Sequence, residues 1–309
     1  MNWNSPEIMA VVRRALAEDL GSGDATALAT VPSSASAHAH ILARAGLVVA
    51  GLPLAKGVFQ ALDSTVQVEC LARDGDAVAK DAVLAKITGP ARALLTGERT
   101  ALNFLAHLSG IATLTHHFVE RLAGTKARIR DTRKTTPGLR LLEKYAVRMG
   151  GGTNHRFGLY DAILLKENHI ALAGGVKQAL DQAHAYSSLH TRSEDITAYE
   201  AVGHAPESTI ANSLSVQIEV RDEREVRDAL DAGAQAVLLD NMTPEQAKRC
   251  VEVVRSVRPE CIVEISGGIT LDNARAYALT GADFLSSGAL THSAPAANLS
   301  LLVDSIPGK

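Results

Sequence analysis

Residues 236–268, AVLLDNMTPEQAKRCVEVVRSVRPECIVEISGG, decide the fold of this chain. Ala236 to Leu239 form a short apolar run typical of a buried strand, and Asp240 follows it directly. Thr243-Pro244-Glu245-Gln246 is a capping box that predicts a helix start, and Ile262 to Ile265 form the next apolar run. A strand, a helix and a second strand in this order predict a parallel sheet, either open or closed into a barrel.

The same alternation of strand-like and helical runs extends from Gly110 to near the end of the chain. The first hundred residues differ, because their extended segments cluster together and predict an α+β layer. Residues 186–215 are polar and interrupt the alternation. We expect them to form a surface insertion with a short helix near 198–202, because loops of this length are uncommon in compact domains.

Composition narrows the function classes. A chain of 309 residues suggests roughly two domains. A net charge of −3 and a pI of about 6.4 argue against nucleic-acid binding by bulk basicity. The mean hydropathy is +0.05, and no uncharged apolar stretch predicts a membrane span. The three cysteines form no C-x-x-C pair, and residues 1–6 do not resemble a signal peptide, so we expect a cytoplasmic protein.

Polar, chemically capable residues follow the predicted strands at the point where each strand ends. In an α/β barrel these ends meet on one face, which holds the active site. Their number, in register from strand to strand, is difficult to explain by chance. The strand-end residues are Asp131-Thr132-Arg133-Lys134, Lys166, Glu219, Asp240, Ser266-Gly267-Gly268 and Ser287-Gly288-Ala289.

The residue types indicate an anionic ligand. Several cations, among them Arg133, Arg156 and Lys166, would be costly in one pocket unless an anion balanced them. The last two turns, Ser266-Gly267-Gly268 and Ser287-Gly288-Ala289, suit phosphate binding by backbone N–H groups. The chemistry therefore predicts a phosphorylated sugar and a carboxylated partner.

Each of these signals has a simpler explanation when it is taken alone. Arg133 and Lys134 can be a solvated charge pair, and Lys166 can be a surface residue. Asp240 can merely begin a loop. Ser-Gly turns such as Ser266-Gly267 are common.

Longer motifs make the chain resemble the quinolinate phosphoribosyltransferase family. The resemblance covers nearly the whole chain outside the insertion. Its central run, from Asp131 to His169, is long and specific. The motifs are, in order, Glu18-Asp19-Leu20-Gly21-Ser22-Gly23-Asp24, Glu98-Arg99-Thr100-Ala101-Leu102-Asn103, Asp131 to Gly138, Lys144-Tyr145-Ala146, Gly150 to Arg156, Leu165 to His169, Leu239-Asp240-Asn241, Ser266-Gly267-Gly268 and Gly288 to Ser293.

The resemblance implies an N-terminal α/β sandwich (residues 1–110) and an incomplete, open α/β barrel (111–292), with residues 293–309 returning to the first domain. It implies decarboxylating phosphoribosyl transfer, in which quinolinate and phosphoribosyl pyrophosphate give nicotinate mononucleotide, carbon dioxide and pyrophosphate. This is a pentosyltransferase reaction of NAD biosynthesis, with Mg²⁺ as cofactor. The family also implies a homodimer in which Arg99 reaches the neighbour's active site.

The resemblance also implies substrate-binding and catalytic roles for the residues of this chain that match the family's motifs. The residues expected to bind the quinolinate carboxylates are Arg133, His155, Arg156, Lys166 and the neighbour's Arg99. Lys134 and Lys166 are expected to contact phosphoribosyl pyrophosphate, and Glu219 and Asp240 the ribose. Lys134, Lys166, Glu219 and Asp240 are the expected catalytic residues. The remaining substrate-binding candidates are Thr132, Ser266, Gly267, Gly268, Ser287, Gly288, Ala289 and His292, mostly around the 5′-phosphate.

This chain departs from the family in two places, the insertion at 186–215, which is longer than the family predicts, and the residues beside Glu219. We expect Mg²⁺ to be held mainly by the substrate, with Glu219 and Asp240 as candidate contacts and no dedicated protein site. In this chain Gln217 and Arg221 flank Glu219, where the family usually shows alternating acids. The alternatives are a molybdenum-transport-associated relative of the same fold with another substrate, and a Schiff-base lyase that uses Lys166.

Overall fold

The computed structural model describes residues 1–189 and 214–305, and within these the chain forms two compact units. Unit 1 consists of Met1–His116, Thr136–Gly151 and Ser293–Lys309, and unit 2 of His117–Thr135 and Gly152–His292. Most of the predicted insertion, including the helix expected near 198–202, lies outside the described residues.

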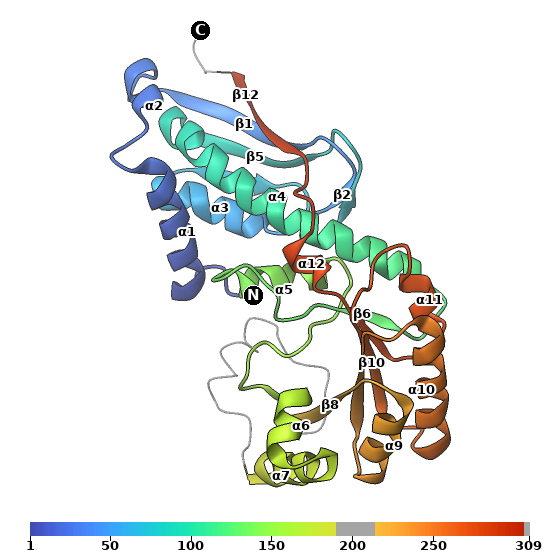
Figure 1. Cartoon of the computed structure of the whole chain (residues 1–309). Helices are drawn as coiled ribbons and strands as arrows, with labels where there is room; N and C mark the ends of the chain where they lie inside the picture. The colour runs from blue at the N-terminus through green and yellow to red at the C-terminus, as the bar shows by residue number, and fades with distance from the viewer. Residues whose placement is uncertain (190–213, 306–309) are drawn as a thin grey trace. The chain divides into compact units, whose positions relative to one another are not determined.

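Unit 1 is built on an antiparallel sheet in the order β12-β1-β5-β3. Figure 1 shows β12, from the end of the chain, lying beside β1. The elements of this unit are α1 (Pro6–Leu20), α2 (Ala25–Thr30), β1 (Ser36–Ala43), β2 (Leu47–Val48), α3 (Leu52–Leu62), β3 (Gln67–Cys70), β4 (Ala77–Val78), β5 (Val83–Pro90), most of α4 (Ala91–Leu122), α5 (Arg140–Met149) and β12 (Leu299–Ser305).

Local sequence explains how these elements begin. Ser5 caps α1 by accepting a hydrogen bond from the N–H of Ile8, and Pro6 occupies the first helical position, as the sequence predicts. Helix α4 runs through Gly110 without a break. A Cβ at Gly110 would lie 2.1 Å from the carbonyl oxygen of Pro295, so this glycine allows a close backbone approach within unit 1.

Unit 2 contains a six-stranded parallel sheet in the order β6-β11-β10-β9-β8-β7. Its elements are β6 (Arg128–Arg130), β7 (Ala162–Leu165), α6 (Glu167–Ala173), α7 (Val176–Leu189), β8 (Ser215–Val220), α9 (Glu223–Asp231), β9 (Ala236–Asp240), α10 (Pro244–Val257), β10 (Ile262–Ser266), α11 (Ala274–Ala278), β11 (Phe284–Ser286) and α12 (Ala289–His292). Figure 1 shows α9 and α10 running alongside these strands.

The barrel of unit 2 is not closed. Strands β6 and β7 follow one another in the chain but form opposite edges of the sheet. Thr153 adds a single parallel bridge to Arg130 on the free edge of β6. The prediction of an α/β fold with an incomplete barrel is confirmed.

Candidate active site

The register of the parallel strands places polar residues in rows at their carboxyl ends. Asp240 on β9 pairs with Ser266 on β10, and Ser266 pairs with Ser286 on β11. Lys166 follows the last residue of β7 directly, and Glu219 lies near the end of β8. All strands of this sheet run in the same direction, so their carboxyl ends lie at one end of the sheet. The residues at these strand ends therefore lie there together.

Three other charged groups act on Asp240. The ammonium group of Lys166 forms an ion pair with the carboxylate of Glu219. Burial raises the pKa of Asp240, and the negative charge of Glu219 raises it further, while the positive charges of Lys166 and Lys134 act in the opposite direction. The net shift is upward, so the folded protein disfavours a charge on Asp240. Two of the expected cations and both acids thus lie within electrostatic range of one another.

The two glycine turns are shaped by close contacts. Gly267 has a φ of 96°, and a Cβ there would lie 2.2 Å from Oδ1 of Asn241. Gly288 packs against Lys134 and His292, since a Cβ at this position would lie 3.0 Å from Cδ of Lys134 and from Nε2 of His292. A side chain at either position would therefore press against these neighbours, which explains the glycines.

Hydrogen bonds join the turn after β6 to the turn after β11. The hydroxyl of Thr291 donates to the carbonyl oxygen of Lys134 at 2.8 Å. The N–H of Lys134 donates to Oγ1 of Thr132 at 3.0 Å, so Thr132 shapes the turn that presents Lys134. Ser287 is buried, and its hydroxyl donates to the carbonyl oxygen of Ile269. Its side chain therefore supports the turn, and its neighbour Gly288 lies next to Lys134.

Besides Lys134 and Lys166, the basic side chains of Arg133, His155 and Arg156 form a second basic group. The carboxylate of the buried Asp131 accepts hydrogen bonds from Nδ2 of Asn154 (2.5 Å) and the N–H of His155 (2.9 Å), which fixes this segment against the end of β6. Burial lowers the pKa of Arg156, and the positive charge of Arg133 lowers it further. The positive charges of these two guanidinium groups therefore repel each other, while the negative charge of Asp161 acts on Arg156 in the opposite direction.

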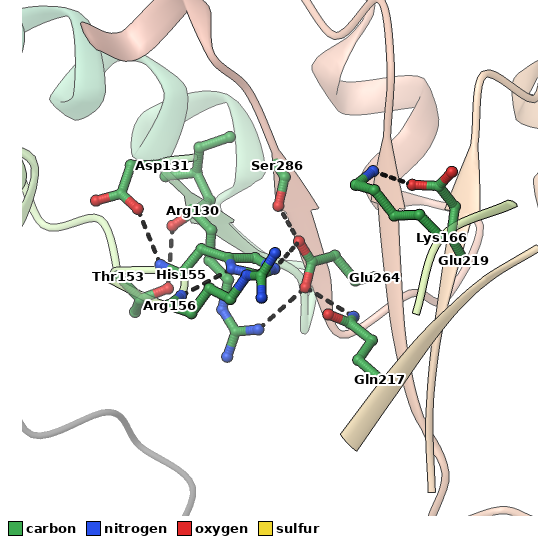
Figure 2. Close-up of polar contacts among 11 residues, drawn as sticks. Arg130, Asp131, Thr153, His155, Arg156, Lys166, Gln217, Glu219, Glu264 and Ser286 are labelled. Atoms are coloured by element: carbon green, nitrogen blue, oxygen red, sulfur yellow. Dashed lines mark hydrogen bonds and ion pairs between the residues drawn. The ribbon is translucent and has the colours of Figure 1, made fainter. Parts of the chain in front are cut away.

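The acid Glu264, in the middle of β10, is the functional candidate that the sequence interpretation missed. It is fully buried, and its Oε2 accepts hydrogen bonds from Nη1 of Arg130 and Nε2 of Gln217, both at 3.1 Å. Its Oε1 accepts from the hydroxyl of Ser286 and lies 3.5 Å from Nε2 of His155. Figure 2 shows these side chains around the Glu264 carboxylate, with the Lys166–Glu219 pair apart from them. The available signal was a charged residue inside the apolar run Ile262 to Ile265.

Residues of this second group border a cavity of about 100 Å³ in unit 2. Its lining combines polar side chains with apolar residues from the amino-terminal parts of β7, β8, β9 and β10. The polar lining is formed by Arg130, Asn154, His155, Arg156, Asp161, Ser215 and Gln217. Lys166 is not part of this lining and faces Glu219 instead.

The two residues flanking Glu219 have other partners. Gln217 bonds to Glu264, as described above. Arg221 forms ion pairs with Glu167 (2.7 Å) and Glu225 (2.8 Å). Arg99 is exposed on α4 of unit 1.

Comparisons with known proteins agree with the motifs. The model of the quinolinate phosphoribosyl transferase N-terminal domain matches residues 24–109, and that of the C-terminal domain matches residues 111–196 and 190–302. A probable nicotinate-nucleotide pyrophosphorylase (carboxylating) of Bacillus subtilis is 39% identical over 92% of this chain and 89% of its own length. The chloroplastic enzyme of the same name from Arabidopsis thaliana is 36% identical over 96% of this chain and 83% of its own length.

Solved structures give the same result. NadC from Streptococcus pyogenes is 36% identical, with a TM-score of 0.83 over 97% of this chain and 98% of that one. The nicotinate-nucleotide pyrophosphorylase of Francisella tularensis is 35% identical, with a TM-score of 0.83 and the same coverage. This protein therefore belongs to the quinolinate phosphoribosyltransferase family.

Proposed function

We propose that this protein catalyses the decarboxylating transfer of a phosphoribosyl group from phosphoribosyl pyrophosphate to quinolinate, a step of NAD biosynthesis. One observation carries the proposal. In a chain of this family, Lys134, Lys166, Glu219 and Asp240 lie within electrostatic range of one another at the carboxyl ends of parallel strands. Such a group of two cations and two acids suits a substrate with both anionic and developing cationic parts.

The second basic group is the proposed quinolinate site. Arg133 and Arg156 repel each other in the ligand-free protein, and a dicarboxylate between them would remove that repulsion. Guanidinium groups also match carboxylates through paired hydrogen bonds. We assign His155 and Lys166 to the same ligand.

Phosphoribosyl pyrophosphate would bind along the strand ends. The proposed 5′-phosphate cradle consists of the backbone of Ser266, Gly267, Gly268, Ser287, Gly288 and Ala289, with His292. Lys134 lies against Gly288, so it is suited to bridge the phosphate cradle and the ribose site. Thr132 holds the turn that presents this lysine.

The chemistry needs no covalent intermediate with the protein. As the bond between C1 of the ribose and pyrophosphate breaks, its electron pair leaves with pyrophosphate and positive charge develops on the sugar. Glu219 and Asp240 would stabilise that charge while the pyridine nitrogen attacks. The nitrogen then carries the glycosyl bond, so the cationic ring can accept the electron pair released when the 2-carboxylate leaves as carbon dioxide. A proton from solvent completes the ring carbon.

The residues also fit Mg²⁺ held chiefly by substrate. Mg²⁺ commonly uses one or two carboxylates together with substrate phosphates, and Glu219 and Asp240 provide that number. Bound there, the ion would neutralise pyrophosphate charge.

We propose a homodimer in which the exposed Arg99 of one copy reaches the quinolinate site of the other. We also propose the cytoplasm as its compartment. The three cysteines are free thiols, which fits a reducing environment. Among the described residues, no helix is long and apolar enough to cross a bilayer.

The decisive experiment measures release of labelled carbon dioxide from quinolinate labelled in its 2-carboxylate. We expect release only when phosphoribosyl pyrophosphate and Mg²⁺ are both present, together with equimolar nicotinate mononucleotide. Release without phosphoribosyl pyrophosphate, or no release at all, would contradict the proposal. Borohydride in the same reaction tests the lyase alternative, which requires a covalent adduct on Lys166.

A further inference from the structure

We propose that Glu264 is a positioning residue that orients His155, and through it Arg156, for recognition of the quinolinate carboxylates. The inference rests on the proposed function and adds a residue that lies in the barrel interior, below the strand ends. It is drawn from the contacts of the Glu264 carboxylate, which join four separate parts of unit 2.

Each oxygen of the carboxylate has its own partners. Oε2 accepts from Arg130 on β6 and from Gln217 on β8. Oε1 accepts from Ser286 on β11 and faces Nε2 of His155 at 3.5 Å. The carboxylate therefore cannot rotate without breaking contacts on both sides, and its orientation is fixed.

The ring of His155 is in turn held from two sides. Its Nδ1 accepts a hydrogen bond from the backbone N–H of Arg156 at 2.7 Å, and its Nε2 faces Glu264. The guanidinium group of Arg156 donates to the carbonyl oxygen of Ala162 at 3.0 Å, next to the cavity. A change in the tilt of the ring would therefore be transmitted to the backbone from which the Arg156 side chain starts (Figure 2).

The electrostatic setting explains why a carboxylate stands here. Arg130 lies over the ring of Phe284, with its guanidinium carbon 3.2 Å from the ring centroid, and it donates a hydrogen bond to Glu264. Burial raises the pKa of Glu264, but the nearby His155 ring, the positive charge of Arg130 and the hydrogen bonds from Ser286 and Gln217 outweigh it, so the net shift is downward. Glu264 thus favours its ionised form and supplies negative charge beside Arg130 and His155.

A purely structural role is the competing explanation, because removing one partner of a buried ion pair destabilises a protein. Asp283 provides a matched control. Its carboxylate binds Lys126 (2.9 Å), Arg255 (2.6 Å) and the N–H of Val263 (2.8 Å), and so also joins β10 to neighbouring elements. It lies immediately before β11, at the end opposite the strand-end residues.

The test compares E264Q, E264D and D283N in steady-state assays with each substrate varied. Glutamine removes the charge but keeps an oxygen that can accept from Ser286. We expect E264Q to lower kcat/KM for quinolinate ten- to a hundredfold and to change the KM of phosphoribosyl pyrophosphate less than threefold. E264D, which keeps the charge, should retain more activity. D283N should lower the melting temperature and leave both KM values within twofold of wild type.

A double-mutant cycle with H155A then separates positioning from general damage. If Glu264 acts through His155, E264Q should reduce kcat/KM for quinolinate little further once His155 is absent, whereas D283N and H155A should combine additively. Additive losses for E264Q and H155A, a loss that D283N reproduces, unchanged kinetics, or failure of both Glu264 variants to fold would each overturn the inference. The activity of the wild-type protein in the same assay tests the proposed function separately from the role of Glu264. An inactive wild type would contradict the proposed activity itself.

Discussion

Replacing Arg133 by methionine is expected to remove about half or more of the stabilisation that quinolinate confers on the protein. Methionine keeps a long apolar stem and removes only the guanidinium group. The pKa of Arg156 is lowered by burial and then by the charge of Arg133. The folded state therefore carries a repulsion between the two guanidinium groups, which a bound dicarboxylate would offset.

The magnitude follows from the hydrogen bond that the guanidinium group would donate to a quinolinate carboxylate. Quinolinate at 100 times its wild-type Kd should stabilise the protein by about 2.7 kcal/mol. Without that charge-assisted hydrogen bond, binding should weaken by about 1.5–3 kcal/mol, which raises the Kd roughly 10- to 150-fold. At the same ligand concentration the variant should then gain only about 0.3–1.4 kcal/mol. With roughly 2–4 °C per kcal/mol, the melting temperature should rise by about 5–11 °C for wild type and about 1–6 °C for the variant.

The assay is thermal unfolding with and without quinolinate, in the absence of phosphoribosyl pyrophosphate. R227M is the matched control, because Arg227 is exposed on α9 and pairs locally with Glu223. Its quinolinate-dependent shift should equal that of wild type. A full shift in the Arg133 variant would remove this residue from the quinolinate site.

Three further predictions concern the strand-end site and the dimer. K134A should fold normally and lose turnover more than a hundredfold, measured as carbon dioxide release and checked by circular dichroism. D240N should also lose turnover but gain stability, because the folded protein raises the pKa of Asp240 and disfavours its charge. The gain in stability should be absent at a pH well below 3.8. It should appear as the pH rises through the folded pKa and persist at neutral pH. A stability difference that does not depend on pH would contradict this. Mixing R99A with R133A should restore activity through hybrid dimers, and no recovery despite proven subunit exchange would contradict a shared site.

Local sequence was sufficient to predict the strand ends of unit 2. Strands β7, β9 and β11 are short apolar runs that end in or are followed by a polar residue, and parallel strands bring such residues to one edge whatever the helices between them contain. Asp240 and Lys166 could therefore be assigned to the same region before the structure was known. The capping box at Thr243 likewise fixed the start of α10, as the structure shows.

Features that depend on pairing between distant segments could not be predicted in the same way. No local signal reveals that Glu264 meets Arg130 across more than a hundred residues of sequence. Helix α5 lies in unit 1, although its neighbours in sequence lie in unit 2, and the division between the units falls within α4 instead of at Gly110. Strand β3 is mostly exposed and lies at an edge of its sheet.

The interior of this open barrel explains why function and stability should respond differently to substitutions there. Closed α/β barrels fill their interiors with layers of branched apolar side chains. Here an interior row holds Glu264 between Leu238 and Phe284 in register, and Arg130 and Gln217 reach it from other strands. A buried charge pair adds little net stability compared with apolar packing, so stability alone does not explain its presence. Its partners extend to His155 and to Ser286, which precedes the Ser287-Gly288 turn, so the interior charges connect both proposed substrate regions. Substitutions of interior charges should therefore alter substrate recognition more than substitutions of equally buried apolar residues with the same effect on the melting temperature.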